Sequence, residues 1–326
     1  MQWIKKTFSV LLRISISIIL LVFLFSQVDK KVLFEVIRGA NKPLLLIGLL
    51  IFFFNYLFCL IRWIILLKAA DIHLPLKRIV ISFSGGVFFN LILPSTIGGD
   101  LMRSLDLAAH TKKPKEIVAT VLLDRLSGYI GLVLMAVAAL VVGWKMVRDN
   151  SIILSIGIIS LLLVAILLVL FNNTIYSRIN RFLGASGAGR IKEMIRSLHQ
   201  EIHIFRSHRK MILKNIGLSL LVQLTSPLSF YFIALALNIK IGLIYFFVYL
   251  PIIGAITLLP ISIGGLGLRD ASTIFFFAKA GVTKDLAFAM SLISFVFVIF
   301  YGAIGGLIYV LTIHHRRLQP AQPPAS

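Results

Sequence analysis

Cysteine and acidic residues are scarce in this sequence of 326 residues. The single cysteine, Cys59, excludes an intrachain disulfide, and no group of Cys and His has the spacing of a metal site. Asp and Glu number 12 against 33 Lys and Arg, which gives a formal net charge of +21. The motif G-x-x-x-x-G-K-[ST] is also missing, so the sequence does not predict a nucleotide-binding P-loop.

Apolar residues are abundant instead. They make up 59% of the chain, the mean hydropathy is +0.99, and several runs approach the twenty residues that cross a bilayer. This predicts a multi-pass membrane protein without a soluble domain of enzyme size. The basic residues mostly fall between the apolar runs, which favours topology control and contact with anionic lipid headgroups over a nucleic-acid partner.

Charge also predicts the sidedness of the runs. The loop 172–210 is the most basic and is expected in the cytoplasm, with both termini, in the cell (inner) membrane. Lys5 and Lys6 precede an apolar segment without a clear cleavage site, which indicates an uncleaved signal anchor. The apolar runs are roughly 9–28, 43–67, 79–94, 117–142, 151–171, 211–237, 241–261, 271–280 and 286–313.

Two of these segments must return to the side from which they enter. Counted outward from the basic loop, 79–94 begins and ends in the cytoplasm, whereas 241–280 begins and ends outside. We therefore predict an all-α polytopic membrane protein with about six full transmembrane helices and two opposed re-entrant hairpins in an inverted repeat.

The domain prediction follows from this topology. It is one membrane-embedded domain, 1–313, with repeat halves of roughly 43–142 and 211–313. The linker 172–210 is amphipathic and cytoplasmic, and 314–326 is a disordered cytoplasmic tail. Histidines in the linker are weak support for metal, so no metal site is expected.

An eleven-residue phrase recurs in the two halves. LPSTIGGDLMR ends at Arg103 and LPISIGGLGLR ends at Arg269, with identical Leu, Pro, Ile, Gly, Gly and Arg positions. Each copy lies at or near the turn of a predicted hairpin, and inverted repeats with broken helices are typical of transporters. The alternative is a chance match among residues that are common in membrane helices.

The phrase has the elements of an anion site. Proline ends a helix, paired glycines allow close approach, a hydroxyl can cap the next helix, and its N-terminus with a nearby arginine can bind phosphate. Such a cavity would hold a lipid phosphate near the midplane. The alternative is a packing hinge whose arginine reaches the interface. The candidate residues are Thr96, Gly98, Gly99, Asp100, Arg103, Ser262, Gly264, Gly265, Arg269 and Asp270.

Further charges lie within apolar runs, at Arg62, Asp124 and Arg125. A charge at the bilayer centre costs about 2.5–3.5 kcal/mol, so a partner or snorkelling to the interface is expected for each. Asp124 can pair with Arg103 or Arg269.

The other candidate pairings involve the acidic residues of the phrases. Arg125 can pair with a ligand phosphate or Asp100. Arg103 has Asp100 and Asp106 at i−3 and i+3 on a shared helix face, which indicates either a structural charge ladder or carboxylates that hold the arginine until substrate competes. Asp270 follows Arg269 directly and can play the same part in the second half.

At these residues the chain resembles the lysylphosphatidylglycerol synthase transmembrane-region family of flippase-like membrane proteins. The resemblance covers nearly the whole chain. It rests on N-x-x-L-P-S-T-I-G-G-D-x-x-R from Asn90, L-D-R ending at Arg125, and L-P-I-S-I-G-G-L-G-L-R-D. The family pattern usually has Glu where Asp100 and Asp270 stand, so the charge is kept on a shorter side chain.

The resemblance implies lipid handling. Bifunctional members carry a cytosolic aminoacyltransferase domain that these 326 residues do not contain, so lysyl transfer is not expected. A flippase or scramblase for an anionic phospholipid or a polyprenyl-phosphate-linked glycolipid is the leading hypothesis, with no cofactor and no catalytic residue. An intramembrane enzyme acting on a lipid phosphate and an accessory scaffold of a lipid-modifying complex stay open, as do homo-oligomerisation and a lipid-modifying partner enzyme.

Overall fold

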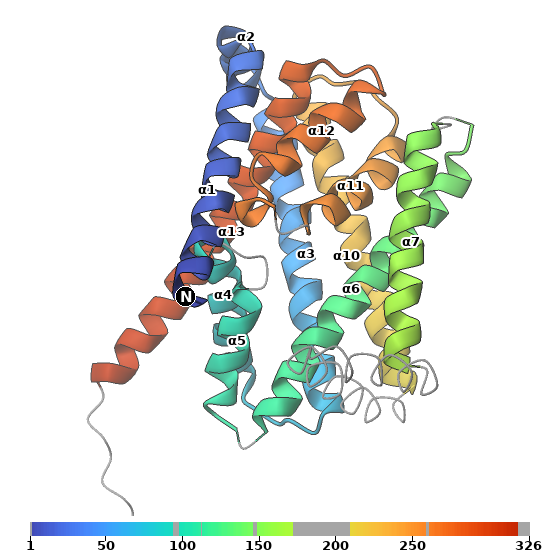
Figure 1. The fold of residues 1–326 in the computed structure, drawn as a ribbon. Coiled ribbons are helices and arrows are strands. Elements are labelled where there is room, and N and C mark those ends of the chain that lie inside the picture. Colours follow the sequence, from blue (N-terminus) through green and yellow to red (C-terminus); the bar gives the residue numbers. More distant parts are fainter. Residues whose placement is uncertain are drawn as a thin grey trace, which may run out of the picture.

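The computed structural model of the protein describes residues 2–93, 98–111, 113–145, 149–171, 209–258 and 261–318. Within these residues the fold is all-helical and contains no β-strand (Figure 1). In chain order the elements are α1 (Gln2–Gln27), α2 (Lys30–Arg38), α3 (Lys42–Ala69), α4 (Leu76–Ile92), α5 (Gly98–Ala108), α6 (Pro114–Val142), α7 (Asn150–Phe171), α10 (Arg209–Ala236), α11 (Leu243–Thr257), the 3₁₀ turn η1 (Ile263–Gly265), α12 (Leu268–Ala278) and α13 (Lys284–Leu318).

Helix boundaries follow local chemistry. Asn41 precedes α3, and its side-chain oxygen accepts a hydrogen bond from the Leu44 N–H at 3.2 Å, with a proline in the first turn. Asp29 caps α2 in the same way, accepting from Lys31 N–H at 2.9 Å. Pro114 lies in the first turn of α6, where its missing N–H costs nothing.

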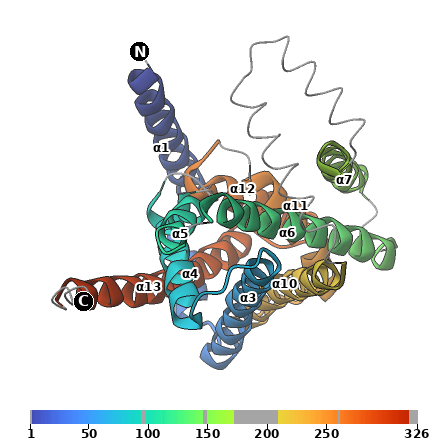
Figure 2. The ribbon, with the colours of Figure 1, turned by 90° about the horizontal axis from the view of Figure 1, so that it is seen from below.

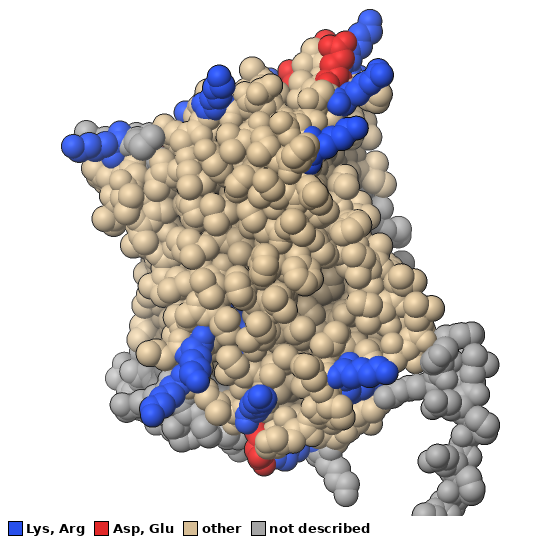
Figure 3. Space-filling model, turned by 180° about the vertical axis from the view of Figure 1, so that it is seen from behind, with Lys and Arg blue, Asp and Glu red and all other residues tan. Residues whose placement is uncertain are grey.

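The helices are those of a multi-pass membrane protein. Among the described residues, five helices are long and apolar enough to cross a bilayer: Lys42–Ala69, Pro114–Val142, Asn150–Leu168, Lys210–Ala236 and Lys284–Thr312. Figure 3 shows lysine and arginine side chains at the two ends of the molecule and a wide uncharged belt between them. The apolar stretch in α1, Ser15–Gln27, is shorter, so the predicted first crossing is not among the five.

Two pairs of short helices sit between the long ones. α4 packs against α5 in the lower half of Figure 1, and α11 packs against α12 in the upper half. α3 and α10 run side by side, as Figure 2 also shows. Each pair also packs against a helix that is distant in the sequence: α4 packs against α13, and α11 packs against α6.

The α4–α13 crossing depends on glycine. A Cβ atom on Gly85 of α4 would lie 2.5 Å from the Tyr309 ring, and one on Gly305 of α13 would lie 2.7 Å from the backbone oxygen of Ser84. The two backbones therefore approach directly at Gly305, as small residues allow in membrane helices, whereas Gly85 leaves room for the Tyr309 ring.

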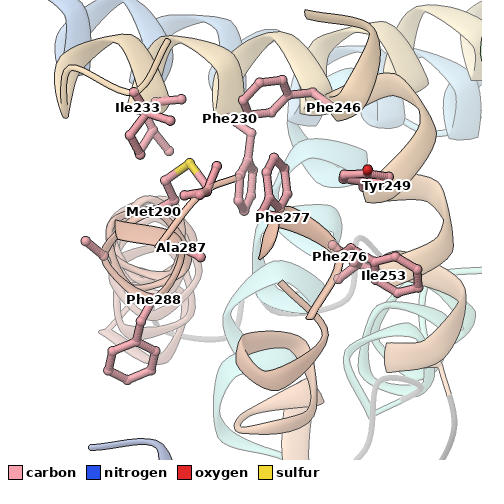
Figure 4. Close-up of a cluster of buried hydrophobic side chains, with 14 of the residues drawn as sticks. Phe230, Ile233, Phe246, Tyr249, Ile253, Phe276, Phe277, Ala287, Phe288 and Met290 are labelled. Carbon is pink, nitrogen blue, oxygen red and sulfur yellow. The ribbon is translucent and has the colours of Figure 1, made fainter. Parts of the chain in front are cut away.

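The largest apolar core joins α10, α11, α12 and α13 (Figure 4). Phe246, Tyr249 and Phe277 are almost completely buried there, and their rings meet at centroid distances of 5.0 to 5.4 Å. Met290 of α13 is fully buried in the same cluster. This packing holds α11 and α12 rigidly against the long helices.

Two of the predicted domain segments lie mostly outside the described residues. Residues 314–318 of the predicted tail form the end of helix α13, whereas 319–326 lie outside the described residues. The predicted amphipathic linker also lies outside them, apart from the start of α10. The division into repeat halves stays a prediction.

Candidate functional site

Five charged side chains from three helices meet inside the bundle. Arg62 comes from α3, Asp100 and Arg103 from α5, and Asp124 and Arg125 from α6. The first four are each at least nine-tenths buried, whereas the Arg125 side chain is 32% exposed. Isolated buried charges are costly, so their mutual contacts decide whether the arrangement is stable.

The contacts form one continuous network. Arg62 Nε donates to Asp124 Oδ1 at 2.6 Å, and Arg103 Nη2 donates to Asp124 Oδ2 at 2.9 Å. Arg103 Nε also donates to Asp100 Oδ1 at 3.1 Å, and Arg125 Nε donates to Asp100 Oδ2. Each carboxylate therefore receives two guanidinium groups, and Arg103 connects the two carboxylates.

Arg103 retains one unused donor. Its Nη1 atom is buried and has no hydrogen-bond partner in the described structure. The guanidinium carbon lies 4.7 Å from the centroid of the Trp63 ring and 5.8 Å from that of Phe83, within cation–π range. These rings contact the guanidinium group but do not supply the hydrogen-bond acceptor that Nη1 lacks.

A cavity of about 180 Å³ opens beside the network. All five charged residues line it, together with Asn55, Tyr56, Cys59 and Asn90. Three guanidinium groups against two carboxylates leave an excess of one positive charge at this wall. An anion with several acceptor oxygens would neutralise the excess and accept the free N–H.

The cavity lies between the middle of the membrane helices and one of their ends. Arg62 precedes the end of α3 at Ala69 by about two turns, roughly 10 Å at 1.5 Å per residue. Asp124 lies roughly 15 Å from the start of α6 on the same side. The site expected near the midplane is therefore displaced toward the side predicted to be cytoplasmic.

Glycine and Asn90 position α5 in the site. Gly99 N–H donates to Asn90 Oδ1 of α4 at 3.0 Å, so a side chain from another helix satisfies one of the free donors in the first turn of α5. A Cβ on Gly99 would lie 2.0 Å from the Gly86 backbone oxygen, so only glycine allows this contact. A Cβ on Gly98 would similarly strike Leu93. Thr96 lies outside the described residues.

The second copy of the phrase is arranged differently. Arg269 Nη2 donates to the neighbouring Asp270 at 2.7 Å and Arg269 Nε donates to Ser291 at 3.1 Å, while Ser291 donates to the same carboxylate. Asp270 is completely buried and also accepts from Gly267 N–H at 3.0 Å. This group is closed on itself, and none of it lines the cavity around Arg103.

The turn before α12 uses left-handed glycine conformations. Gly264, Gly265 and Gly267 have φ values of 57°, 77° and 76°. Gly267 is the N-cap residue of α12, so the expectation that Ser262 caps this helix is wrong. Ser262 is buried, and its Oγ atom has no hydrogen-bond partner in the described structure.

Some pairings follow the sequence prediction and others do not. Asp124 pairs with Arg103, as one alternative predicted, but not with Arg269, and Arg125 pairs with Asp100. The predicted contact of Arg103 with the carboxylate one turn later is wrong.

That carboxylate, Asp106, pairs instead with Arg78 of α4 at 2.6 Å, an arginine that the sequence analysis did not select. The sequence could have indicated Arg78, because it lies at the margin of an apolar run and its own helix has no acidic residue to pair with it. In the described part of the chain, no three His, Cys, Asp or Glu side chains gather as metal ligands.

Comparisons with known proteins find similarity to membrane proteins. A UPF0104 membrane protein of Methanothermobacter thermautotrophicus is 26% identical over 285 residues, covering 79% of this chain and 82% of that protein. A UPF0104 membrane protein of Pyrococcus horikoshii is 20% identical over 305 residues, covering 87% of this chain and 90% of its own length.

The family model described as the lysylphosphatidylglycerol synthase TM region matches residues 10–306. This range contains the charged cavity, both helix pairs and both copies of the phrase. The chain therefore belongs to the lysylphosphatidylglycerol synthase transmembrane-region family.

Proposed function

We propose that this protein is a lipid transporter of the flippase or scramblase type, which moves an anionic phospholipid or a polyprenyl-phosphate-linked glycolipid between leaflets. The charged cavity is the observation that carries the proposal. It places an excess positive charge and a free, buried Arg103 N–H among helices long enough to cross a membrane. A guanidinium group binds phosphate oxygens with matched geometry, and a phosphodiester carries the one negative charge that balances the wall.

The ion pairs supply a means of binding and release. In the structure Arg103 is shared between Asp100 and Asp124, and Arg125 contacts Asp100. A phosphate group that enters the cavity competes with these carboxylates for the same donors. Exchange of one anionic partner for another avoids the cost of an unpaired buried arginine, so binding is reversible.

The two helix pairs supply the access routes. In this proposal α1, α3, α6, α7, α10 and α13 cross the membrane, whereas α4–α5 and α11–α12 enter from opposite faces and return. Both termini are cytoplasmic in the cell membrane. The reciprocal packing of α4 on α13 and α11 on α6 supports two related, inverted halves. Movement of one half against the other would open the cavity to each leaflet in turn.

A substrate panel tests the proposal. Purified full-length protein is reconstituted in liposomes with fluorescent phosphatidylglycerol, a fluorescent polyprenyl-phosphate sugar or fluorescent phosphatidylcholine, and movement between leaflets is followed by quenching. We expect faster movement of an anionic lipid than of phosphatidylcholine. Mass spectrometry of the recovered lipids separates the alternatives: a changed headgroup would indicate an enzyme, and neither movement nor change would favour a scaffold.

A further inference from the structure

A second hollow adjoins the charged cavity. It measures about 270 Å³, lies between α3, α4 and α13, and is lined almost entirely by apolar side chains. Tyr56, Phe83 and Val87 line both hollows, so the charged cavity and the apolar one share a wall. We call the second hollow the apolar groove.

The apolar groove opens on the lipid-facing surface. Its rim includes Phe53 of α3 and Ile304 and Ile308 of α13, which are 45%, 39% and 37% exposed. All three lie within helices that are long and apolar enough to cross the membrane. The surroundings of this opening are therefore hydrocarbon rather than water.

The groove has a structural cause. α4 and α13 touch through glycine, whereas α3 packs mainly against α10 and makes few contacts with either. Gly305 of α13 and Ser84 of α4 form the floor where the backbones meet, and Tyr56 and Leu57 of α3 form the opposite wall. The backbone of α3 therefore stays farther from the α4–α13 pair than those two helices are from each other, and side chains span the seam: the Tyr301 ring contacts Tyr56, and its hydroxyl donates to the Leu49 carbonyl at 2.8 Å.

We infer that this seam is the lateral entrance for an anionic lipid, with the phosphodiester at Arg103 and Arg125 and the first part of a hydrocarbon chain in the apolar groove. The inference rests on the proposed function and specifies its substrate as an amphiphile held at both ends. The two hollows differ in the way that the two parts of a lipid differ: one carries an excess of positive charge and the other is apolar. A free, water-soluble phosphodiester would use only the first.

Cys59 provides the reporter. It is the only cysteine of the chain, it lines the charged cavity, and it is partly exposed. The full-length protein in detergent is treated with methyl methanethiosulfonate, an uncharged thiol reagent, and the rate of Cys59 modification is measured. The two probes are dioctanoyl phosphatidylglycerol and its deacylated headgroup, glycerophosphoglycerol. Both should slow the modification, the lipid at lower concentration.

A variant that fills the groove separates the two parts of the site. Ile304→Trp should raise the half-protecting concentration of the lipid about tenfold, the effect of displacing about two methylene groups, and leave that of the headgroup unchanged. Val310→Trp is the matched control, because Val310 is 54% exposed on the opposite face of α13. Ile308→Trp repeats the test on a second rim residue should Ile304→Trp unfold.

The outcomes are distinct. Lipid protection that is equal in Ile304→Trp and Val310→Trp overturns the inference but leaves an anion site. An equal loss of lipid and headgroup protection in Ile304→Trp also overturns it, because the effect would then be on the charged cavity. If neither probe protects Cys59 in the wild-type protein, the proposed function itself loses its site.

Discussion

Asp124 is the residue on which the charged cavity depends most. It is 4% exposed and accepts from Arg62 at 2.6 Å and from Arg103 at 2.9 Å. Asp124→Asn keeps the volume but removes the charge, so two buried guanidinium groups lose their common counter-ion. Breaking a buried ion pair from one side costs about 3–5 kcal/mol. The asparagine oxygen can still accept one hydrogen bond, so we expect a loss near 3 kcal/mol.

The assay is reversible unfolding in mixed detergent micelles. A loss of about 3 kcal/mol corresponds to roughly a hundredfold change in the unfolding equilibrium. Asp71→Asn is the control, because Asp71 pairs with Lys113 at 3.2 Å but its side chain is 80% exposed, and such pairs contribute little. If Asp124→Asn and Asp71→Asn unfold alike, the network does not hold α3, α5 and α6 together and the reasoning is refuted.

The same variant links stability to binding. Asp124→Asn raises the excess charge at the cavity from one to two, since three guanidinium groups then face one carboxylate. A ligand that binds the folded state stabilises it, and an anion should bind this variant more tightly. Added dioctanoyl phosphatidylglycerol should therefore restore more stability to Asp124→Asn than it adds to the wild-type protein. An equal increment in both would contradict an anion site.

Three further predictions concern packing, capping and pH. Gly305→Ala places a Cβ 2.7 Å from a backbone oxygen of α4 and should destabilise the fold by about 1–3 kcal/mol in the same unfolding assay. Gly217→Ala is the control, because Gly217 has open space around it and its substitution should not destabilise the fold. Similar effects of the two substitutions would contradict the close crossing of α4 and α13. Asn90→Ala leaves a buried N–H of α5 without its partner and should cost about 1–3 kcal/mol, so an unchanged unfolding midpoint would contradict its capping role. Lys279 donates to Asp149 and lowers the pKa of that carboxyl, so the pair stabilises the fold above about pH 4 and loses this contribution as the pH falls further. Asp149→Asn should therefore show a shallower fall of the thermal unfolding midpoint on acidification than the wild-type protein. Equal slopes in the two proteins would contradict the pair.

The helical class was predictable because it depends on composition, and the pair α11–α12 lies within the segment 241–280 that the sequence predicts to return. The first pair was predicted less well, because the run 79–94 forms the single helix α4 and its partner α5 lies beyond that run. Apolar runs of membrane-spanning length predict helices, and the Pro and Gly of each phrase predict where two short helices separate. The start of α4 at Leu76 and the end of α13 at Leu318 were harder to predict, because charged residues can continue a helix beyond the apolar run.

The two copies of the phrase were expected to act alike, and their different geometry has a cause in the sequence. Aligned on the shared arginine, Asp100 corresponds to Leu266 and Ser104 corresponds to Asp270. The acid precedes Arg103 by one helical turn, which leaves that arginine free to reach α6. In the second copy the acid follows Arg269 directly and binds it locally.

Partners on distant helices could not be read from the chain. Arg62 and Asp124 lie 62 positions apart, and nothing in either apolar run says that their helix faces meet. The apolar groove was hidden for the same reason. It depends on the close approach of α4 to α13 and on the gap that this leaves beside α3, which are properties of packing rather than of any segment.

Lipid movement by two arginine variants tests the central claim most directly. Arg103→Ala and Arg269→Ala are reconstituted at equal density with wild-type protein, and the movement of fluorescent phosphatidylglycerol between leaflets is measured. Arg103 lines the charged cavity with a free N–H, whereas Arg269 is held by Asp270 and Ser291 away from it. We predict at least a tenfold slower movement in Arg103→Ala, the loss of about one charge-assisted hydrogen bond, and near wild-type movement in any Arg269→Ala protein that remains folded. Wild-type movement in Arg103→Ala would contradict the assignment of this cavity to the lipid headgroup.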